Sequence, residues 1–168
     1  MITKKYIFPP VISVLGHVDH GKTTLLDAIR KSNIAAKEHG GITQKIGAST
    51  IEILHEGQKR KLTFIDTPGH EAFSKMRSRG AQAADIGLLI VSAVDGVMPQ
   101  TKESIQLLQH AGIPFIVVLT KIDSEEKNPE KVKQQVIREN VLLEGYGGDV
   151  PVIEISARTG QNMKELLD

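Results

Sequence analysis

Cysteine is absent from this sequence of 168 residues, and neither sign of charge is in excess. The lack of cysteine excludes a disulfide framework and a thiolate metal site, and it fits a reducing compartment. The 21 Lys and Arg residues against 20 Asp and Glu residues leave a net charge of +1. This balance excludes the strongly basic surface of a stand-alone nucleic-acid-binding protein.

Long hydrophobic runs are absent as well. The longest apolar stretches, such as residues 86–94, have the length of a strand and are far too short to span a membrane. Residues 1–8 contain two lysines but no apolar run of signal-peptide length. The sequence therefore predicts one globular domain that is cytoplasmic and has no membrane contact.

Short apolar runs rich in β-branched residues alternate with helical patterns along the chain. Strands are predicted at residues 11–15, 49–55, 61–65, 86–92, 115–119 and 152–155, and helices at 24–31, 100–110, 129–143 and from 162 onward. This alternation predicts an α/β fold with a mostly parallel six-stranded sheet and helices on both faces. The hairpin signal at residues 56–58 adds one antiparallel edge strand. In such sheets ligands bind beyond the carboxyl ends of the strands, so the residues that follow each strand matter most.

Residues 16–23, Gly-His-Val-Asp-His-Gly-Lys-Thr, match the phosphate-loop pattern GxxxxGK[ST] and lie between a predicted strand and a predicted helix. Glycines allow backbone N–H groups to surround the α- and β-phosphates, Lys22 reaches the β- and γ-phosphates, and the hydroxyl of Thr23 binds Mg²⁺. The motif predicts a P-loop NTPase fold. Its candidate nucleotide-binding residues are Asp19, His20, Gly21, Lys22, Thr23 and Thr24.

Two further segments are candidates for the γ-phosphate and the metal. Asp66 ends an apolar strand beside the phosphate loop, where a carboxylate can hold Mg²⁺ through water. Gly69 can bring its N–H against the γ-phosphate because it has no Cβ. Thr43, in the glycine-containing loop before the second strand, can offer a second hydroxyl to Mg²⁺ when GTP is bound.

The fourth and fifth motifs concern the base. Thr120, Lys121 and Asp123 follow an apolar strand, and one carboxylate can accept both N1–H and the 2-amino group of guanine. Adenine lacks this pair of donors, so Asp123 favours GTP over ATP. Ser156, Ala157 and Arg158 follow the last strand, where the N–H of Ala157 can donate to guanine O6.

Together these motifs, in this order, resemble the five GTP-binding motifs of a GTPase, and their wording is that of the translational GTPases. Gly-Gly-Ile-Thr-Gln at 40–44, the segment around residues 72–81 and Asp-Gly-Val-Met-Pro-Gln-Thr at 95–101 are similar to the G domain of the initiation factor two family. The similarity covers nearly the whole chain. We therefore expect residues 1–9 to be an N-terminal extension and residues 10–168 to be a GTP-binding domain from a longer protein.

The resemblance implies a domain that binds GTP or GDP with Mg²⁺ and hydrolyses GTP slowly on its own. In the full factor it implies initiator tRNA placement through domains absent here, subunit joining, and stimulation by the RNA of the large ribosomal subunit. His70 takes the place of a water-orienting glutamine, and Val18 and Ile42 resemble the apolar gate that restrains it. Asp19 resembles an aspartate that helps to bind a monovalent cation, K⁺ or Na⁺.

One residue departs from the family pattern, because Thr120 stands where an asparagine usually contacts guanine and joins the base-binding loop to the phosphate loop. Three alternatives remain at this point. The chain could be an ATP-using P-loop protein, a translational GTPase of the elongation-factor type, or a nucleotide-gated binding module with negligible hydrolysis. We expect a monomer in each case.

Overall fold

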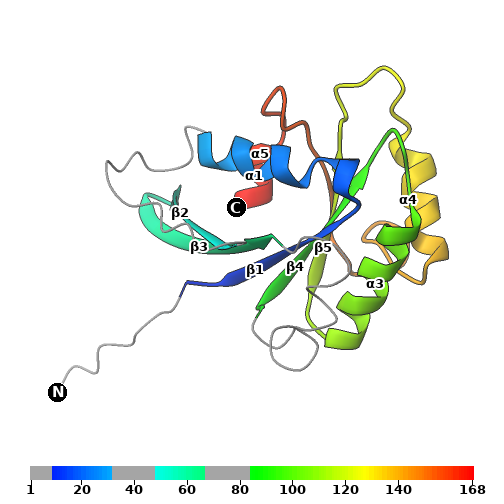
Figure 1. Ribbon diagram of the computed structural model, residues 1–168, viewed down its shortest axis with the longest axis horizontal. Helices are drawn as coiled ribbons and strands as arrows, with labels where there is room; N and C mark the ends of the chain where they lie inside the picture. The colour runs from blue at the N-terminus through cyan, green and yellow to red at the C-terminus, as the bar shows by residue number, and fades with distance from the viewer. Residues whose placement is uncertain (1–8, 32–47, 67–83) are drawn as a thin grey trace.

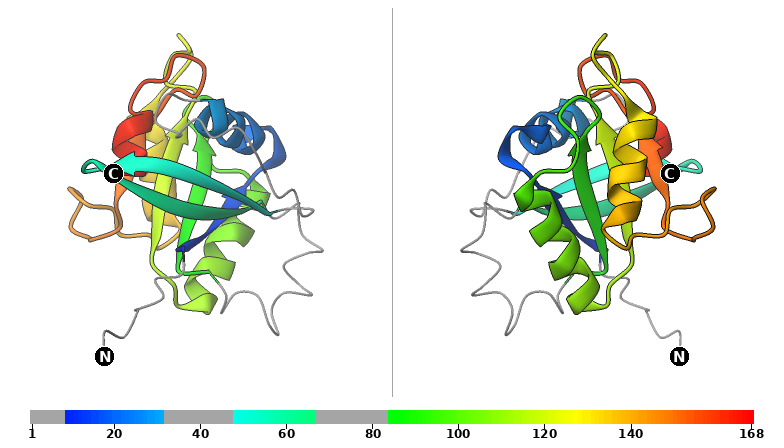
Figure 2. Two further views of the ribbon diagram at one scale, coloured as in Figure 1. Left: turned by 90° about the vertical axis from the view of Figure 1, so that its left-hand side faces the viewer. Right: turned by 90° about the vertical axis from the view of Figure 1, so that its right-hand side faces the viewer.

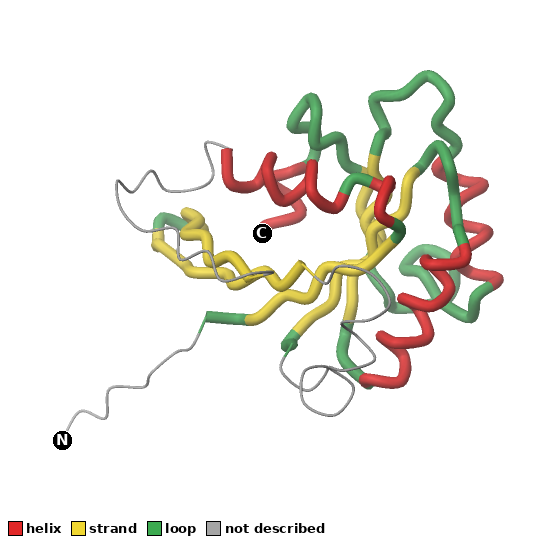
Figure 3. Tube along the Cα trace, viewed as in Figure 1, coloured by secondary structure: helices red, strands yellow, loops and turns green. Residues whose placement is uncertain are grey.

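The computed structural model describes residues 9–31, 48–66 and 84–168, and these residues form a layered α/β domain (Figures 1 and 3). At its centre lies a sheet of six strands in the order β2-β3-β1-β4-β5-β6. The strands are β1 (Val11–Gly16), β2 (Ala48–His55), β3 (Gln58–Asp66), β4 (Ile86–Ser92), β5 (Phe115–Thr120) and β6 (Val152–Glu154). Neighbouring strands pair in parallel except for edge strand β2, which pairs antiparallel with β3. The predicted sheet is confirmed.

Helices cover both faces of the sheet, as Figure 2 shows. The described helices are α1 (Lys22–Lys31), α3 (Pro99–Ala111), α4 (Pro129–Arg138) and α5 (Met163–Leu167), with a short 3-10 helix η1 (Val18–His20) before α1. The side chains of α1 and α5 pack on one face, and those of α3 and α4 pack on the other.

The central strands are buried on both sides, which explains their nearly continuous apolar sequence. Successive side chains of β4 point to opposite faces. Leu88 lies in the cluster that contains Leu25 of α1. Leu89 lies in the cluster that contains Ile105 of α3 and Val136 of α4.

Two element boundaries differ from the prediction by three residues or more. Helix α4 ends at Arg138 and not at residue 143, because Asn140 adopts a left-handed φ of +63° and turns the chain. Strand β3 begins three residues earlier than predicted, because Glu56 and Gly57 alone form the hairpin turn with φ values of +48° and +74°. Positive φ at both central residues is the geometry that suits the twist of a hairpin.

Among the described residues, no helix combines the length and the apolar character needed to cross a membrane.

Candidate nucleotide-binding site

The loop between β1 and α1 begins with a close contact between two strands. Gly16 has a φ of +148°, and a Cβ at this position would lie 2.3 Å from the carbonyl oxygen of Ile90 on β4. Only glycine fits there. After η1, Gly21 has a φ of +97°, and its carbonyl accepts the first helical bond from the N–H of Leu25 at 2.8 Å. The N-terminus of α1 thus follows directly on the loop, as anion binding at a helix N-terminus requires.

Lys22 and Asp66 bring the start of α1 to the end of β3. The Lys22 side chain is only 7% exposed, and its Nζ lies 3.9 Å from Oδ1 of Asp66. Burial lowers the pKa of Lys22, and the Asp66 carboxylate acts in the opposite direction. The hydroxyl-bearing Thr23 and Thr24 are the next residues of α1 and are exposed. Thr23 and Asp66 therefore offer hard oxygen donors in the same part of the site, which fits the ligand preference of Mg²⁺.

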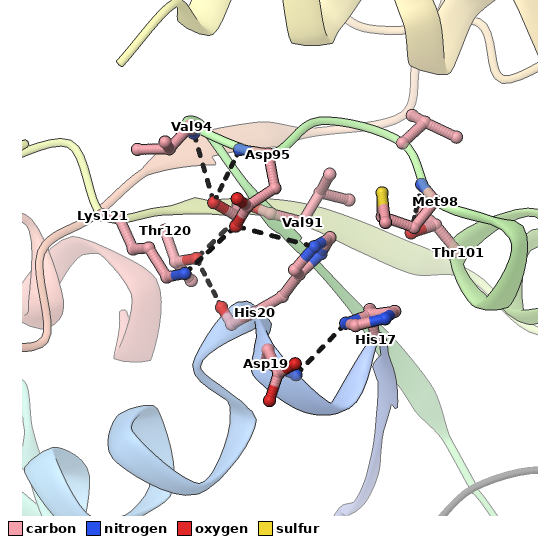
Figure 4. A network of polar contacts seen from close by, with 12 residues as sticks. His17, Asp19, His20, Val91, Val94, Asp95, Met98, Thr101, Thr120 and Lys121 are labelled. Atoms are coloured by element: carbon pink, nitrogen blue, oxygen red, sulfur yellow. Dashed lines mark hydrogen bonds and ion pairs between the residues drawn. The ribbon is translucent and has the colours of Figure 1, made fainter. Parts of the chain in front are cut away.

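The base-binding loop is joined to the phosphate loop by Thr120. Its buried hydroxyl donates to the carbonyl oxygen of His20 at 2.6 Å, and the carbonyl of Val91 lies 3.4 Å away (Figure 4). Threonine is shorter than the asparagine usual at this position, but its hydroxyl still links the two loops. An unpaired buried carbonyl costs stability, so the bond to the His20 carbonyl holds the two loops together.

His20 lies in this junction as a neutral ring. Its side chain is 1% exposed, and burial is the main reason why its pKa is lowered to about 4. The ring stacks obliquely on His17 with their centroids 4.7 Å apart, and its Nδ1 has no hydrogen-bond partner within the described part of the chain. The ring is oriented toward Asp95 (Figure 4). The part of His20 that joins the two loops is its backbone carbonyl.

Asp123 is fixed by the segment that follows β6. The buried hydroxyl of Ser156 donates to Oδ1 of Asp123 at 2.7 Å, and this bond is the main cause of the lowered pKa of Asp123. The exposed Arg158 places Nη1 3.8 Å from Oδ2 of Asp123. A second bond, from the N–H of Ile122 to the carbonyl of Ile155 at 3.4 Å, joins the same two segments. Asp123 is therefore an ionised, oriented acceptor at the carboxyl edge of the sheet.

Several predicted residues are not assessed by this geometry. Ile42, Thr43, Gly69 and His70 lie outside the described residues, and for Val18 only the backbone is described. Asp19 is exposed within η1, and its N–H donates to Nδ1 of His17 at 3.2 Å. The half-buried Ala157 lies between Ser156 and Arg158.

The contact that Asp95 makes was not predicted from the sequence. Its Oδ2 lies 3.1 Å from Nζ of Lys121, so it reaches the base-binding loop from the turn that follows β4. The rule that residues following each strand matter most would have indicated it, but an Asp-Gly pair reads as an ordinary turn.

Comparison with known proteins supports the assignment made from the motifs. The model of the elongation factor Tu GTP binding domain matches residues 10–168. The chain is 58% identical to the chloroplastic translation initiation factor IF-2 of Rhodomonas salina over 160 residues, which cover 95% of this chain and 21% of that protein. It is 54% identical to the translation initiation factor IF-2 of Synechococcus sp. strain CC9605, over 95% of this chain and 14% of that protein. The chain thus spans about a fifth or less of the length of these curated relatives.

Solved structures show the same likeness. The GDP-bound aIF5B of Aeropyrum pernix aligns with a TM-score of 0.70 and 37% identity, covering 95% of this chain and 34% of that one. The apo form of elongation factor SelB from Methanococcus maripaludis aligns with a TM-score of 0.68 and 28% identity, covering 95% and 32%. The predicted resemblance to the initiation factor two family is confirmed. The chain therefore belongs to the family of the elongation factor Tu GTP binding domain, as a translational GTPase G domain whose sequence is similar to that of translation initiation factor IF-2.

Proposed function

We propose that this chain is the GTP-hydrolysing switch of a cytoplasmic translation initiation factor of the IF-2 type and acts as a monomer within it. The single observation that carries the proposal is the junction of the two nucleotide loops. The hydroxyl of Thr120, next to the base-reading Asp123, bonds to the carbonyl of His20 in the phosphate loop. We propose that the nucleotide binds with its base at Asp123 and its phosphates at Lys22.

Guanine is the proposed base because the site offers an oriented carboxylate. Asp123 is ionised, and Ser156 restrains one of its oxygens. Two adjacent donors on guanine complement two carboxylate oxygens, and charged acceptors make the stronger hydrogen bonds. We propose that the N–H of Ala157 donates to guanine O6. Adenine lacks this pair of adjacent donors, so ATP would not complement the Asp123 carboxylate.

At the phosphate end, Lys22 and the amides at the start of α1 would bind the β- and γ-phosphates. Thr23 and Asp66 would hold Mg²⁺, together with Thr43. When bound, the metal neutralises charge on the β- and γ-phosphate oxygens. Lys22 and the backbone N–H groups stabilise the charge that develops there during hydrolysis, because they are oriented before the reaction begins. Gly69 would donate its N–H to the γ-phosphate.

The ribosome is the proposed partner of the whole factor, and initiator tRNA would bind only through domains outside this chain. We propose that His70 orients the attacking water. Val18 and Ile42 would keep His70 away from this water until the RNA of the large subunit repositions the His70 side chain.

His70→Ala tests this mechanism. In the full-length factor it should leave GDP and GTP affinities near those of the wild type, while ribosome-stimulated hydrolysis falls by roughly a hundredfold or more, as for loss of a catalytic acid–base group. Single-turnover hydrolysis with and without 70S ribosomes measures this effect. Stimulated turnover that survives in the variant would make His70 a structural residue. If the wild type binds GTP but its GTP hydrolysis is not stimulated by 70S ribosomes, the chain is a binding module with negligible hydrolysis.

Asp19 is proposed to help bind a monovalent cation near the β–γ bridge, since its exposed carboxylate lies within the phosphate loop. Replacing K⁺ by a bulky organic cation at constant ionic strength should then slow GTP hydrolysis or weaken GTP binding. Equal rates and equal affinities in the two salts would exclude the cation site.

A further inference from the structure

The turn after β4 holds Asp95 in one orientation. The N–H groups of Val94 and Asp95 both donate to the hydroxyl oxygen of Ser92, at 3.2 and 3.1 Å. From the opposite side, the side chain of Gln135 on α4 accepts the N–H of Val97 at 3.0 Å. The turn is therefore fixed at both ends, and it directs the Asp95 carboxylate toward the two nucleotide loops (Figure 4).

The carboxylate meets Lys121 of the base-binding loop. Oδ2 of Asp95 accepts from Nζ of Lys121 at 3.1 Å, and both side chains are about two-fifths exposed. Hydrogen bonding with Ser92 is the main cause of the lowered pKa of Asp95, and Lys121 contributes to it. Asp95 is thus negatively charged at neutral pH and faces a positive charge.

Lys121 needs such a restraint because its backbone is strained. Its φ is +61°, in the left-handed region that side-chain-bearing residues rarely adopt. Strain of this kind persists only where the surroundings impose it. The neighbouring Thr120 fixes the base-binding loop to the phosphate loop through its bond to the His20 carbonyl. Asp95 supplies the corresponding contact on the side chain of Lys121.

His20 is the third group at this carboxylate, but it makes no ion pair there at neutral pH. Its Nε2 lies 3.8 Å from Oδ2 of Asp95, beyond hydrogen-bond distance, and the buried ring is neutral. The charged partner of Asp95 is therefore Lys121.

We propose that Asp95 is a positioning residue for the guanine nucleotide. By holding Lys121, it keeps the base-binding loop in the conformation that binds guanine and so slows nucleotide dissociation. The proposal rests on the proposed function, because it assumes that guanine nucleotide lies between these loops. The physical reason is preorganisation, since a loop already held in its binding conformation loses less entropy when the nucleotide binds.

The test is the dissociation rate of a fluorescent GDP from the chain. Asp95→Asn keeps the shape of the side chain and removes its charge. We expect dissociation to be roughly two- to fivefold faster, the upper range for a partly exposed ion pair. The matched control is Glu139→Gln. It removes a carboxylate that binds Nζ of Lys102 at 3.0 Å between α3 and the end of α4, outside the nucleotide loops.

Two readouts separate positioning from a general effect on the fold. In a Lys121→Gln background, Asp95→Asn should add little or nothing to the dissociation rate, because its partner is already gone. Added salt should reduce the difference between wild type and Asp95→Asn, because the pair is partly exposed and therefore screened. The unfolding midpoint of the nucleotide-free variant should match that of the Glu139→Gln control.

The outcomes are distinct. If the wild type binds fluorescent GDP, but GDP dissociates no faster from Asp95→Asn than from Glu139→Gln, then the role of Asp95 is overturned. The proposed function is left standing in that case. An equal effect of Asp95→Asn in the wild-type and Lys121→Gln backgrounds would overturn it too. A wild type with no affinity for guanine nucleotide would overturn both the proposed function and this inference.

Discussion

Replacing Lys22 with alanine is expected to weaken the binding of GDP and GTP by a factor of roughly 10² to 10⁴. This range assumes two charge-assisted bonds to phosphate oxygens, worth about 1.5–3 kcal/mol each. The Lys22 side chain is nearly buried, and its Nζ lies 3.9 Å from Oδ1 of Asp66. Burial lowers the pKa of Lys22, and bound phosphate oxygens would favour its charged form.

Titration with a fluorescent GDP measures the loss of affinity. Lys31→Ala is the matched control, because Lys31 is an exposed lysine at the other end of α1. The control should bind GDP like the wild type. The unfolding midpoint of each variant without nucleotide shows whether removal of the buried charge has changed the fold. Unchanged GDP affinity in Lys22→Ala would refute the phosphate-loop assignment.

The fold was predictable from the sequence because its central strands are buried on both faces. Their sequences are short apolar runs bounded by polar residues, and the helices between them have apolar faces. The end of α4 was not predictable in this way. Val141 and Leu143 continue the apolar pattern and are buried, yet they follow the left-handed turn at Asn140 and pack outside the helix. A buried apolar residue satisfies the same pattern in a helix or in a turn, so periodicity alone gives no boundary.

The site was predictable where a motif carries its own geometry. Lys22 and Asp123 each follow a strand in a fixed pattern, and the sheet brings both to its carboxyl edge. The bond between Thr120 and His20 was not predictable, because it joins residues 100 positions apart. Asp95 was missed because an Asp-Gly pair reads as an ordinary turn, and because its partner Lys121 becomes a neighbour only when the ends of β4 and β5 lie side by side. The roles of Thr43 and His70 stay predictions.

Exchanging Asp123 for asparagine should move the base preference from guanine toward xanthine. Xanthine keeps N1–H but carries a carbonyl in place of the 2-amino group. Asparagine matches this with one acceptor and one donor, whereas the aspartate of the wild type opposes the carbonyl with its own negative oxygens. The hydroxyl of Ser156, which donates to Oδ1 of Asp123 at 2.7 Å, can hold either side chain in place. The substitution therefore changes the recognition pattern with little change of shape.

For guanine nucleotides, the variant loses a charge-assisted pair and sets an amide donor against the 2-amino donors. The expected cost is about 2–4 kcal/mol, or roughly thirty- to a thousandfold in affinity. Lys22 and Asp66, the proposed phosphate and metal residues, are unchanged in this variant, so we expect the phosphates still to bind. Competition between GTP and XTP in the wild type and the variant measures the exchange of preference. Asp149→Asn, at an exposed aspartate in the loop before β6, is the control and should prefer GTP as the wild type does. If Asp123→Asn also keeps a preference for GTP, then Asp123 does not read the base, and the choice of guanine loses its main physical support.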